Sequence, residues 1–187
     1  DFNIGSMVRT ANAFQARRVH IVGPHKWNRK GALMTELYQH VENHPSIAQL
    51  VECWHNRIAG EIAAARAEAG AAAFHAHEAA VHGDTAVVAA ATAQVDAAEV
   101  RIRELEASRV IAMDIIPGAV PMETYRFPKR CLMLFGAEGP GLSEKALELA
   151  DDVVYISQFG SVRSINAGAA AAVSMHAWIA QHAAIRG

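Results

Sequence analysis

Two strand, glycine-loop and helix units near the end of the chain constrain its fold more than any other feature. The apolar run 131–135 is bounded by Gly136, and the run 153–156 repeats the pattern before Gly160. Short apolar runs bounded by glycine are typical of buried strands. Open α/β sheets bind their ligands in the loops at the carboxyl ends of strands, so we expect a ligand site here.

Each loop leads into a predicted helix with a polar residue in the capping position. Ser143 precedes residues 144–150, and Ser164 or Asn166 precedes the alanine-rich stretch 167–183. Serine and asparagine are favoured at such positions because their side-chain oxygens accept hydrogen bonds from the first backbone N–H groups of a helix. The sequence therefore predicts an α/β fold.

The first glycine loop is similar to known nucleotide-binding loops but differs from each of them at a decisive point. From Gly136 to Ser143 it has the glycine spacing of a phosphate-binding loop, yet Leu142 stands where the phosphate-neutralising lysine is needed. This argues against a nucleoside triphosphatase. The spacing of Gly136, Gly139 and Gly141 also departs from the dinucleotide fingerprint, which argues against a hydride-transfer enzyme.

Three blocks of sequence carry a resemblance to a known family. They are NIGSMVRTANAF at 3–14, LFGAEGPGLS at 134–143 and YISQFGSVRSINAGAAAA at 155–172. In content, order and spacing they resemble the SpoU-type (TrmH-like) RNA ribose 2'-O-methyltransferases of the SPOUT class. The resemblance covers residues 1 to about 55 and 109–187. That family places a core strand directly before the first block, so we expect further residues upstream.

The resemblance implies a fold, a chemistry and a set of site residues. The fold is a parallel sheet with helices on both faces and a deep trefoil knot made by the C-terminal loops, in a homodimer. The chemistry is methyl transfer from S-adenosylmethionine, without a metal, to a ribose 2'-hydroxyl of structured RNA, either tRNA or rRNA. Catalytic roles are implied for Asn3, Arg9, Glu138, Ser164 and Asn166. Cofactor binding is implied for Leu134, Gly136, Gly141, Ile156, Ile165 and Ala167.

Some of these residues also have a purely structural interpretation, and the chain departs from the family pattern in places. The cofactor-binding positions are equally strand ends and helix starts, Glu138 suits a loop ion pair, and Asn166 suits a helix cap. The departures are Gln15 for a common glycine, Ser157 for a usual proline and Gly168 for a usual serine. Two other functions stay open: a non-catalytic RNA-binding or S-adenosylmethionine-sensing module, and an interaction scaffold.

Basic residues are concentrated at the start of the chain. The formal net charge is −2, but residues 2–35 contain six Lys or Arg and no acid. Such a strip suits backbone phosphates, although a solvated surface without a partner is the alternative. Trp27 lies within it as a possible stacking platform or as a packing residue. Beside Arg9, the residues expected to bind RNA are Arg17, Arg18, Lys26, Arg29 and Lys30.

The middle of the chain predicts two helices of similar length, about 57–81 and 85–108, separated by a turn at 82–84. Apolar residues recur at alternating steps of three and four in both segments, as in a helical seam. We expect an antiparallel hairpin inserted at 57–108 into a methyltransferase domain made of 1–56 and 109–187. The two seams are Ile58, Ile62, Ala65, Ala69, Ala72, Ala76 and Ala79, and Val88, Ala91, Val95, Ala98, Ile102 and Leu105.

Several other site classes are disfavoured by the sequence. His75, Glu78 and His82 share one face of the predicted helix but match no established ligand motif, so no metal site is predicted there. Cys53 and Cys131 are isolated, which disfavours a disulfide or a zinc site. No run of 18 strongly apolar residues and no secretory-type leader is evident, so a cytoplasmic location is expected.

Overall fold

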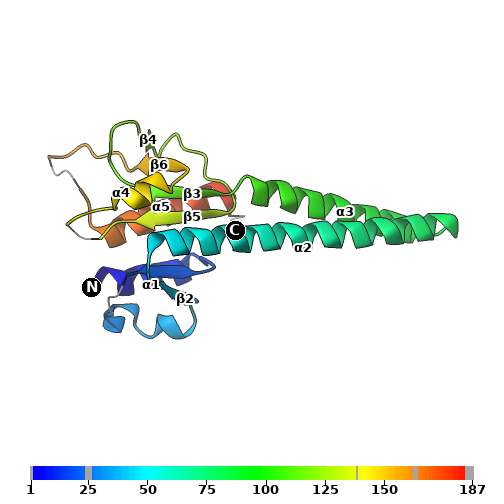
Figure 1. The fold of residues 1–187 in the computed structure, drawn as a ribbon, viewed down its shortest axis with the longest axis horizontal. Coiled ribbons are helices and arrows are strands. Elements are labelled where there is room, and N and C mark those ends of the chain that lie inside the picture. The colour runs from blue at the N-terminus through cyan, green and yellow to red at the C-terminus, as the bar shows by residue number, and fades with distance from the viewer. Residues whose placement is uncertain (1, 24–26, 138, 162–163, 184–187) are drawn as a thin grey trace. The chain divides into compact units, whose positions relative to one another are not determined.

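The computed structural model describes residues 2–23, 27–137, 139–161 and 164–183, so the expectations for Lys26 and Glu138 lie outside it. The chain divides into two compact units (Figure 1). No helix in the described part of the chain is long and apolar enough to cross a membrane. Unit 1 comprises residues 1–52, 109–127 and 131–187, and unit 2 comprises residues 53–108 and 128–130.

Four parallel strands form the main sheet of unit 1, in the order β4-β6-β3-β5. Val110, Ile111 and Ala112 of the inner strand β3 are fully buried, as expected where helices cover both faces of a parallel sheet. The strand predicted at 131–135 is confirmed, and the one predicted at 153–156 is confirmed with a shift of one residue. The strands are β3 (Arg109–Met113), β4 (Val120–Pro121), β5 (Cys131–Phe135) and β6 (Asp152–Tyr155).

Helix α5 (Ala167–His182) packs on this sheet through its last turns. Trp178 contacts a buried cluster that includes Ile111 and Val154. The side chain of Gln181 accepts a hydrogen bond from Phe127 N (2.9 Å) and donates one to the carbonyl of Tyr125 (3.0 Å). Apolar packing and these two polar contacts together fix α5 against the segment that follows β4.

A second sheet of unit 1 has two parallel strands, β1 (Val19–Val22) and β2 (Val41–His44), paired from Val19 with Val41 to Val22 with His44. The short 3-10 helices η1 (Arg29–Ala32) and η2 (Thr35–Leu37) lie between them in sequence. Two strands alone are marginally stable and need packing from elsewhere. Buried Gln39 supplies part of it by donating to the Ala16 carbonyl at 2.8 Å.

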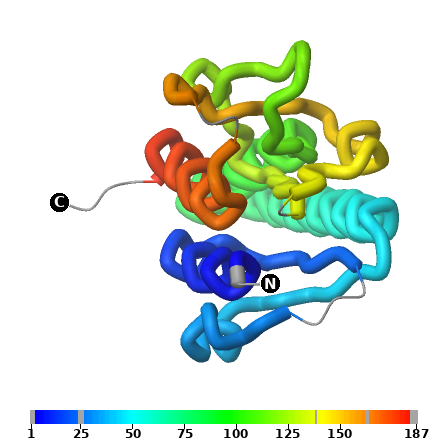
Figure 2. Tube along the Cα trace, turned by 90° about the vertical axis from the view of Figure 1, so that its left-hand side faces the viewer, coloured from blue at the N-terminus to red at the C-terminus, as the bar shows by residue number. Residues whose placement is uncertain are grey.

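Helix α1 (Phe2–Ala13) packs against both η1 and α5, so that segments from opposite ends of the chain lie side by side (Figure 2). Gly5 allows the contact with η1, because a Cβ there would lie 2.8 Å from the backbone of Gly31 and Ala32. On the other side, the ring of Phe14 meets His176 edge to face at 6.0 Å. The first and third sequence blocks are therefore neighbours in space.

Unit 2 is built mainly from α2 (Ile47–Val81) and α3 (Thr85–Glu106). The predicted turn and its cap are confirmed, since Gly83 has φ +75° and Asp84 accepts from the Val87 N–H at 3.1 Å. The predicted start at residue 57 and the equal helix lengths are wrong. Helix α2 has 35 residues and α3 has 22, because Ser46 caps α2 upstream by accepting from Gln49 N at 3.2 Å.

The predicted seams lie between the two helices of unit 2, where every seam residue is buried or half-buried. Ion pairs flank this seam, with Arg66 at 2.9 Å from Glu106 and Arg101 at 3.4 Å from Glu68. These pairs are exposed and so contribute little to stability. The better shielded Arg130–Glu61 pair (2.5 Å) joins the short segment 128–130 to α2.

Candidate active site

The carboxyl ends of three strands meet at one edge of the main sheet. Met113 of β3 pairs with Phe135 of β5 on one side and with Val154 of β6 on the other. The residues that follow these strands therefore leave the sheet together, as they do at ligand sites of open α/β folds. Three residues predicted to bind the cofactor lie at this edge: Leu134 and Gly136 at the end of β5, and Ile156 after β6.

The glycine loop after β5 folds back on itself so closely that glycine is required. A Cβ on Gly136 would lie 2.3 Å from the carbonyl carbon of Gly141. Ala137 and Gly141 exchange two backbone hydrogen bonds of 3.0 and 3.1 Å, and Gly141 has φ +72°, which other residues rarely adopt. Ser143 then caps α4 (Glu144–Glu148), as predicted, by accepting from Ala146 N at 3.2 Å. Backbone contacts between Ala137 and Gly141 thus close this loop.

A side-chain contact joins the first and third sequence blocks. The amide nitrogen of Asn166 donates to Oδ1 of Asn3 at 2.9 Å. Asn166 is also the N-cap of α5, because its own Oδ1 accepts from the N–H groups of Gly168 (2.9 Å) and Ala169 (3.2 Å). Both ends of its amide are engaged, so one orientation is favoured. Of the two capping residues considered for this helix, the structure selects Asn166.

Gly168 lies where this contact leaves little space. A Cβ at this position would be 2.9 Å from Ser6 Oγ and 3.1 Å from Asn166 Oδ1. Ser6 is itself held by donating to the Asn3 carbonyl at 2.8 Å. The resembled family usually has serine at position 168. In this chain, glycine at that position leaves the space that the Ser6 hydroxyl occupies.

Four further predicted site residues, on α1 and at the start of α5, have exposed or half-buried side chains. Arg9 is exposed on α1, and no ion pair engages it within the described part of the chain. Ser164 is exposed just before α5, Ile165 follows it with 37% of its surface accessible, and Ala167 is the first residue of the helix. The structure therefore gathers Asn3 and Asn166 in direct contact and leaves Arg9 and Ser164 open to solvent.

Sequence reasoning missed a carboxylate at the same edge of the sheet. Glu123 follows β4 and accepts from both the backbone N–H (3.3 Å) and the hydroxyl (2.8 Å) of Ser157. Its pKa is below the usual value because its own backbone N–H and then the Ser157 hydroxyl stabilise the charged form. A proline at 157 could make neither bond. The departure at Ser157 is therefore coupled to Glu123, although the sequence alone does not reveal which residue is its partner.

A family model described as the SpoU rRNA Methylase family matches residues 60–176, more than half of the chain. The chain belongs to the SpoU methylase family. The matched range includes the second and third blocks but not the first, 3–14. The parallel α/β architecture is that of SpoU methyltransferase structures.

Two curated relatives match shorter segments. The tRNA (guanosine(18)-2'-O)-methyltransferase of Saccharomyces cerevisiae is 32% identical over 81 residues, which is 43% of this chain and 6% of that protein. The enzyme of the same name from Thermus thermophilus is 49% identical over 47 residues, which is 25% of this chain and 24% of that protein. The matches thus span a small part of either relative.

Solved structures agree in fold over nearly the whole chain. The SpoU methyltransferase AviRb of Streptomyces viridochromogenes, in complex with AdoMet, superposes with a TM-score of 0.62 at 19% identity, over 96% of this chain and 53% of AviRb. The A. aeolicus TrmH/SpoU tRNA modifying enzyme gives a TM-score of 0.62 at 14% identity, over 96% of this chain and 68% of that one. The chain spans about half of AviRb.

Some side chains of the basic strip in this SpoU protein already make contacts within the protein. Arg18 pairs with Glu42 at 2.9 Å, a partner just beyond the acid-free stretch 2–35. Arg29 lies over the ring of Trp27 at 6.0 Å, a cation–π contact that covers one face of that ring. The remaining predicted phosphate contacts in the described residues, Arg17 and Lys30, are exposed.

Proposed function

We propose that this protein transfers a methyl group from S-adenosylmethionine to a ribose 2'-hydroxyl of tRNA or rRNA. Membership in the SpoU family supports the reaction, and the names of the curated relatives support the ribose 2'-hydroxyl and tRNA as targets. The observation that carries the proposal is the 2.9 Å contact between Asn3 and Asn166. It joins the first and third sequence blocks, to which the family resemblance assigns catalytic residues. The contact lies at the start of α5, the helix that follows β6 and the sheet edge proposed to bind the cofactor.

The residues at the sheet edge suit S-adenosylmethionine better than a nucleotide. The loop closed by Gly136 and Gly141 is held by its own backbone hydrogen bonds, and Leu142 stands where a phosphate would need a lysine. Half-buried Ile156 and partly exposed Ile165 offer apolar contacts for an adenine ring. When bound, the cofactor would supply the electrophilic methyl group. With Leu134 and Ala167, these residues form our proposed cofactor site.

Arg9 has the properties required of a residue that acts on RNA. Its guanidinium stays protonated in proteins, so it is unsuited to remove a proton itself. Exposed on α1, it can instead hold the phosphate next to the reacting ribose and stabilise the oxygen as its proton leaves to water. We assign Asn3 and Asn166 to positioning, with Ser164 and Glu138 completing the set that the family resemblance implies.

Four further features belong to the same proposal. The C-terminal segment forms a deep trefoil knot, the protein is a homodimer in which Arg9 acts either within its own subunit or across the interface, no metal takes part in methyl transfer, and the location is cytoplasmic. Residues 57–108 are an inserted helical hairpin, as the separate compactness of unit 2 suggests.

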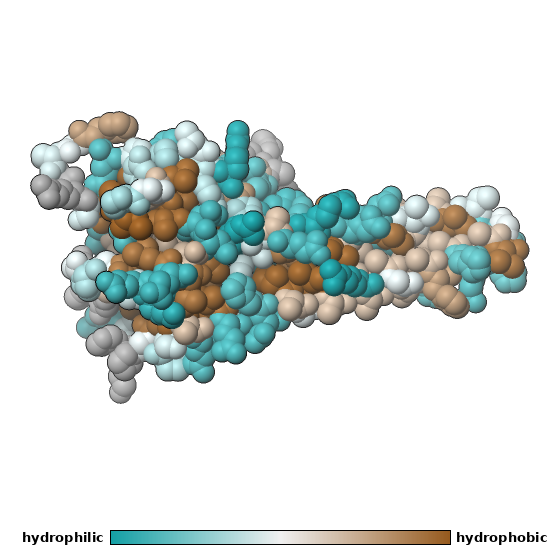
Figure 3. Space-filling model, turned by 45° about the horizontal axis from the view of Figure 1, so that its top comes forward, coloured by the Kyte–Doolittle hydropathy of each residue, from teal (hydrophilic) through white to brown (hydrophobic). Residues whose placement is uncertain are grey.

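Exposed apolar side chains favour a second role, protein contact, for the hairpin. Phe74 and Val81 near the end of α2 are 60% and 72% exposed, and Val87 at the start of α3 is 46% exposed. Apolar surface is visible at that end of the helix pair (Figure 3). Apolar groups that gather at an exposed site often mark a protein interaction surface. The hairpin's acidic residues make direct contact with phosphates unfavourable.

The decisive experiment separates an enzyme from a non-catalytic module of the same fold. Purified protein is incubated with tritiated S-adenosylmethionine and total tRNA or rRNA, and modified nucleotides are then mapped in RNA from cells with and without the gene. We expect tritium in RNA and one or more 2'-O-methyl marks that depend on the gene. Binding of cofactor and RNA without any transfer would support the non-catalytic alternative instead.

A further inference from the structure

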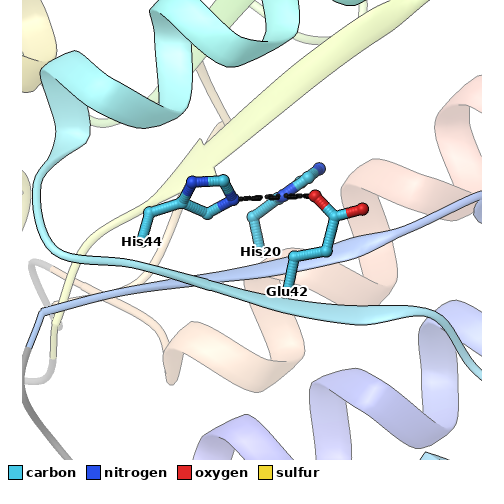
Figure 4. A group of neighbouring side chains, drawn as sticks. All are labelled: His20, Glu42 and His44. Atoms are coloured by element: carbon cyan, nitrogen blue, oxygen red, sulfur yellow. Dashed lines mark hydrogen bonds and ion pairs between the residues drawn. The ribbon is translucent and has the colours of Figure 1, made fainter.

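Three side chains with metal-binding atoms, none of them assigned to methyl transfer, lie together on the two-stranded sheet of unit 1 (Figure 4). His20 of β1 is paired in register with Glu42 of β2. His44 follows Glu42 by two residues and so points to the same face of the sheet. The parallel pairing of β1 and β2 therefore brings two imidazoles and one carboxylate together.

The distances within this cluster match those between the ligands of a bound zinc ion. His20 Nδ1 lies 3.0 Å from His44 Nε2 and 3.5 Å from Glu42 Oε2, and His44 Nε2 lies 3.8 Å from Glu42 Oε2. In a tetrahedral site with bonds of about 2.0–2.1 Å, ligand atoms are roughly 3.3–3.4 Å apart. The three observed values bracket this spacing, so movements of a few tenths of an ångström suffice.

We propose that His20 Nδ1, His44 Nε2 and Glu42 Oε2 form a binding site for a divalent zinc ion, with water in the fourth position. Two imidazole nitrogens and a carboxylate oxygen suit zinc, whereas calcium and magnesium prefer sites made of oxygen alone. Both histidine side chains are only 9% exposed, and Glu42 is 32% exposed. The ion is thus shielded by the rings and reached past the carboxylate.

Arg18 holds the carboxylate in the orientation that such a site needs. Its Nε lies 2.9 Å from Oε1 of Glu42, while both histidines approach Oε2. One carboxylate oxygen is therefore bound by the guanidinium and the other faces the imidazoles. Partners of this kind orient metal ligands and raise affinity without touching the ion.

Zinc at this site would join β1 to β2. The hydrogen bond between the two rings holds a proton where the ion would lie, so binding must move that proton to the outward nitrogen of its ring or release it. An ion bound only by the folded protein stabilises it, and a sheet of two strands gains from such a cross-link.

The test uses the full chain without an affinity tag, stripped with a chelator and titrated with Zn²⁺ by calorimetry and with Co²⁺ by visible absorption. We expect one ion per chain and Co²⁺ bands typical of four- or five-coordinate sites. His20→Gln and Glu42→Gln should each weaken Zn²⁺ binding at least about tenfold. The matched control is His40→Gln, an exposed histidine just before β2, which should bind like the unchanged protein.

A second readout separates loss of the site from loss of the fold. Zn²⁺ should raise the Tm of the unchanged protein and of His40→Gln but not of the other two variants, whose far-UV circular dichroism should stay native without metal. Two ligand variants are used so that, if one of them misfolds, the other still tests the proposal. Equal Zn²⁺ affinity in His20→Gln, Glu42→Gln and the unchanged protein, or no saturable binding to the unchanged protein, would overturn the proposal.

Discussion

The side chain of Asn166 donates a 2.9 Å hydrogen bond to Asn3, which precedes it by 163 residues. The same asparagine caps α5 through its carbonyl oxygen, so one amide serves the helix with one end and the N-terminal helix with the other. Aspartate caps helices as well as asparagine does but has no donor. Substitution can therefore separate the two contacts.

Asn166→Asp should stay close to the unchanged protein in stability while losing methyl transfer, because it keeps the cap and loses the donor to Asn3. Asn166→Ala loses both contacts and should lower the free energy of unfolding by about 1 kcal/mol. Urea denaturation measures the free energy of unfolding, and tritium transfer to RNA measures the activity. Full activity in Asn166→Asp would show that the contact with Asn3 is not needed for the reaction.

Arg9→Ala should lower methyl transfer by about 100-fold or more, since the guanidinium is proposed to stabilise charge that develops during the reaction. Cofactor affinity should be unchanged, because Arg9 is assigned to RNA and not to the cofactor. Transfer assays and calorimetry with S-adenosylmethionine measure the two effects. Arg103→Ala on exposed α3 is the matched control, and equal activity in both variants would remove Arg9 from the mechanism.

Gly136→Ala should destabilise the protein by about 1–3 kcal/mol and abolish cofactor binding, because its Cβ would meet the Gly141 carbonyl carbon at 2.3 Å. Backbone atoms cannot move away as a flexible side chain can. Gly160→Ala is the control in the loop after β6, where no atom lies within 4 Å of an added Cβ. Calorimetry measures cofactor binding, and thermal denaturation measures stability, in the variant and in its control. Wild-type binding by Gly136→Ala would contradict the loop geometry.

Gly168→Ser, which restores the residue usual in the resembled family, should destabilise this chain by about 1 kcal/mol. Its Cβ would lie 2.9 Å from Ser6 Oγ, forcing Ser6 to rotate away from the Asn3 carbonyl. The double variant with Ser6→Ala should recover most of that loss. A double-mutant cycle by urea denaturation measures the coupling, and strict additivity would show that the two positions are independent.

Replacement of residues 57–108 by a short Gly/Ser linker should leave a folded core that still binds S-adenosylmethionine. Unit 1 has its own sheets and buried cluster, so we expect it to fold by itself. Since Arg130 pairs with Glu61 of the removed segment, a second version should carry Arg130→Gln. Circular dichroism, size-exclusion chromatography and calorimetry test the result. Aggregation of both versions would place the hairpin within the core.

The elements that the sequence predicted well are those with strong local signals. Glycine after an apolar run marked β5 and β6, and the caps at Ser143 and Asp84 marked the starts of α4 and α3. A seam of alternating three and four residue steps marked the buried faces of α2 and α3. In each case the local preference and the tertiary packing agree.

The elements that the sequence missed lack such signals. Strands β1 and β2 contain polar residues such as His20, Glu42 and His44, so their apolar pattern is weak. The true start of α2 depends on Ser46, which lies outside the seam. Contacts between distant segments, such as Arg18 with Glu42 and Asn3 with Asn166, have no periodicity to reveal them. The second of these contacts lies at the proposed active site, and the first lies beside the proposed zinc site.

The pairing of α1 with α5 also sets an order of events during synthesis. At roughly 5–20 residues per second, a ribosome needs about 10–30 s to reach Asn166 after Asn3 has been made. During that interval α1, which carries the buried Val8 and Ala11, lacks its contacts with α5. The nascent chain must therefore keep its first helix soluble, through early contact with η1 or through a chaperone, until the last helix emerges.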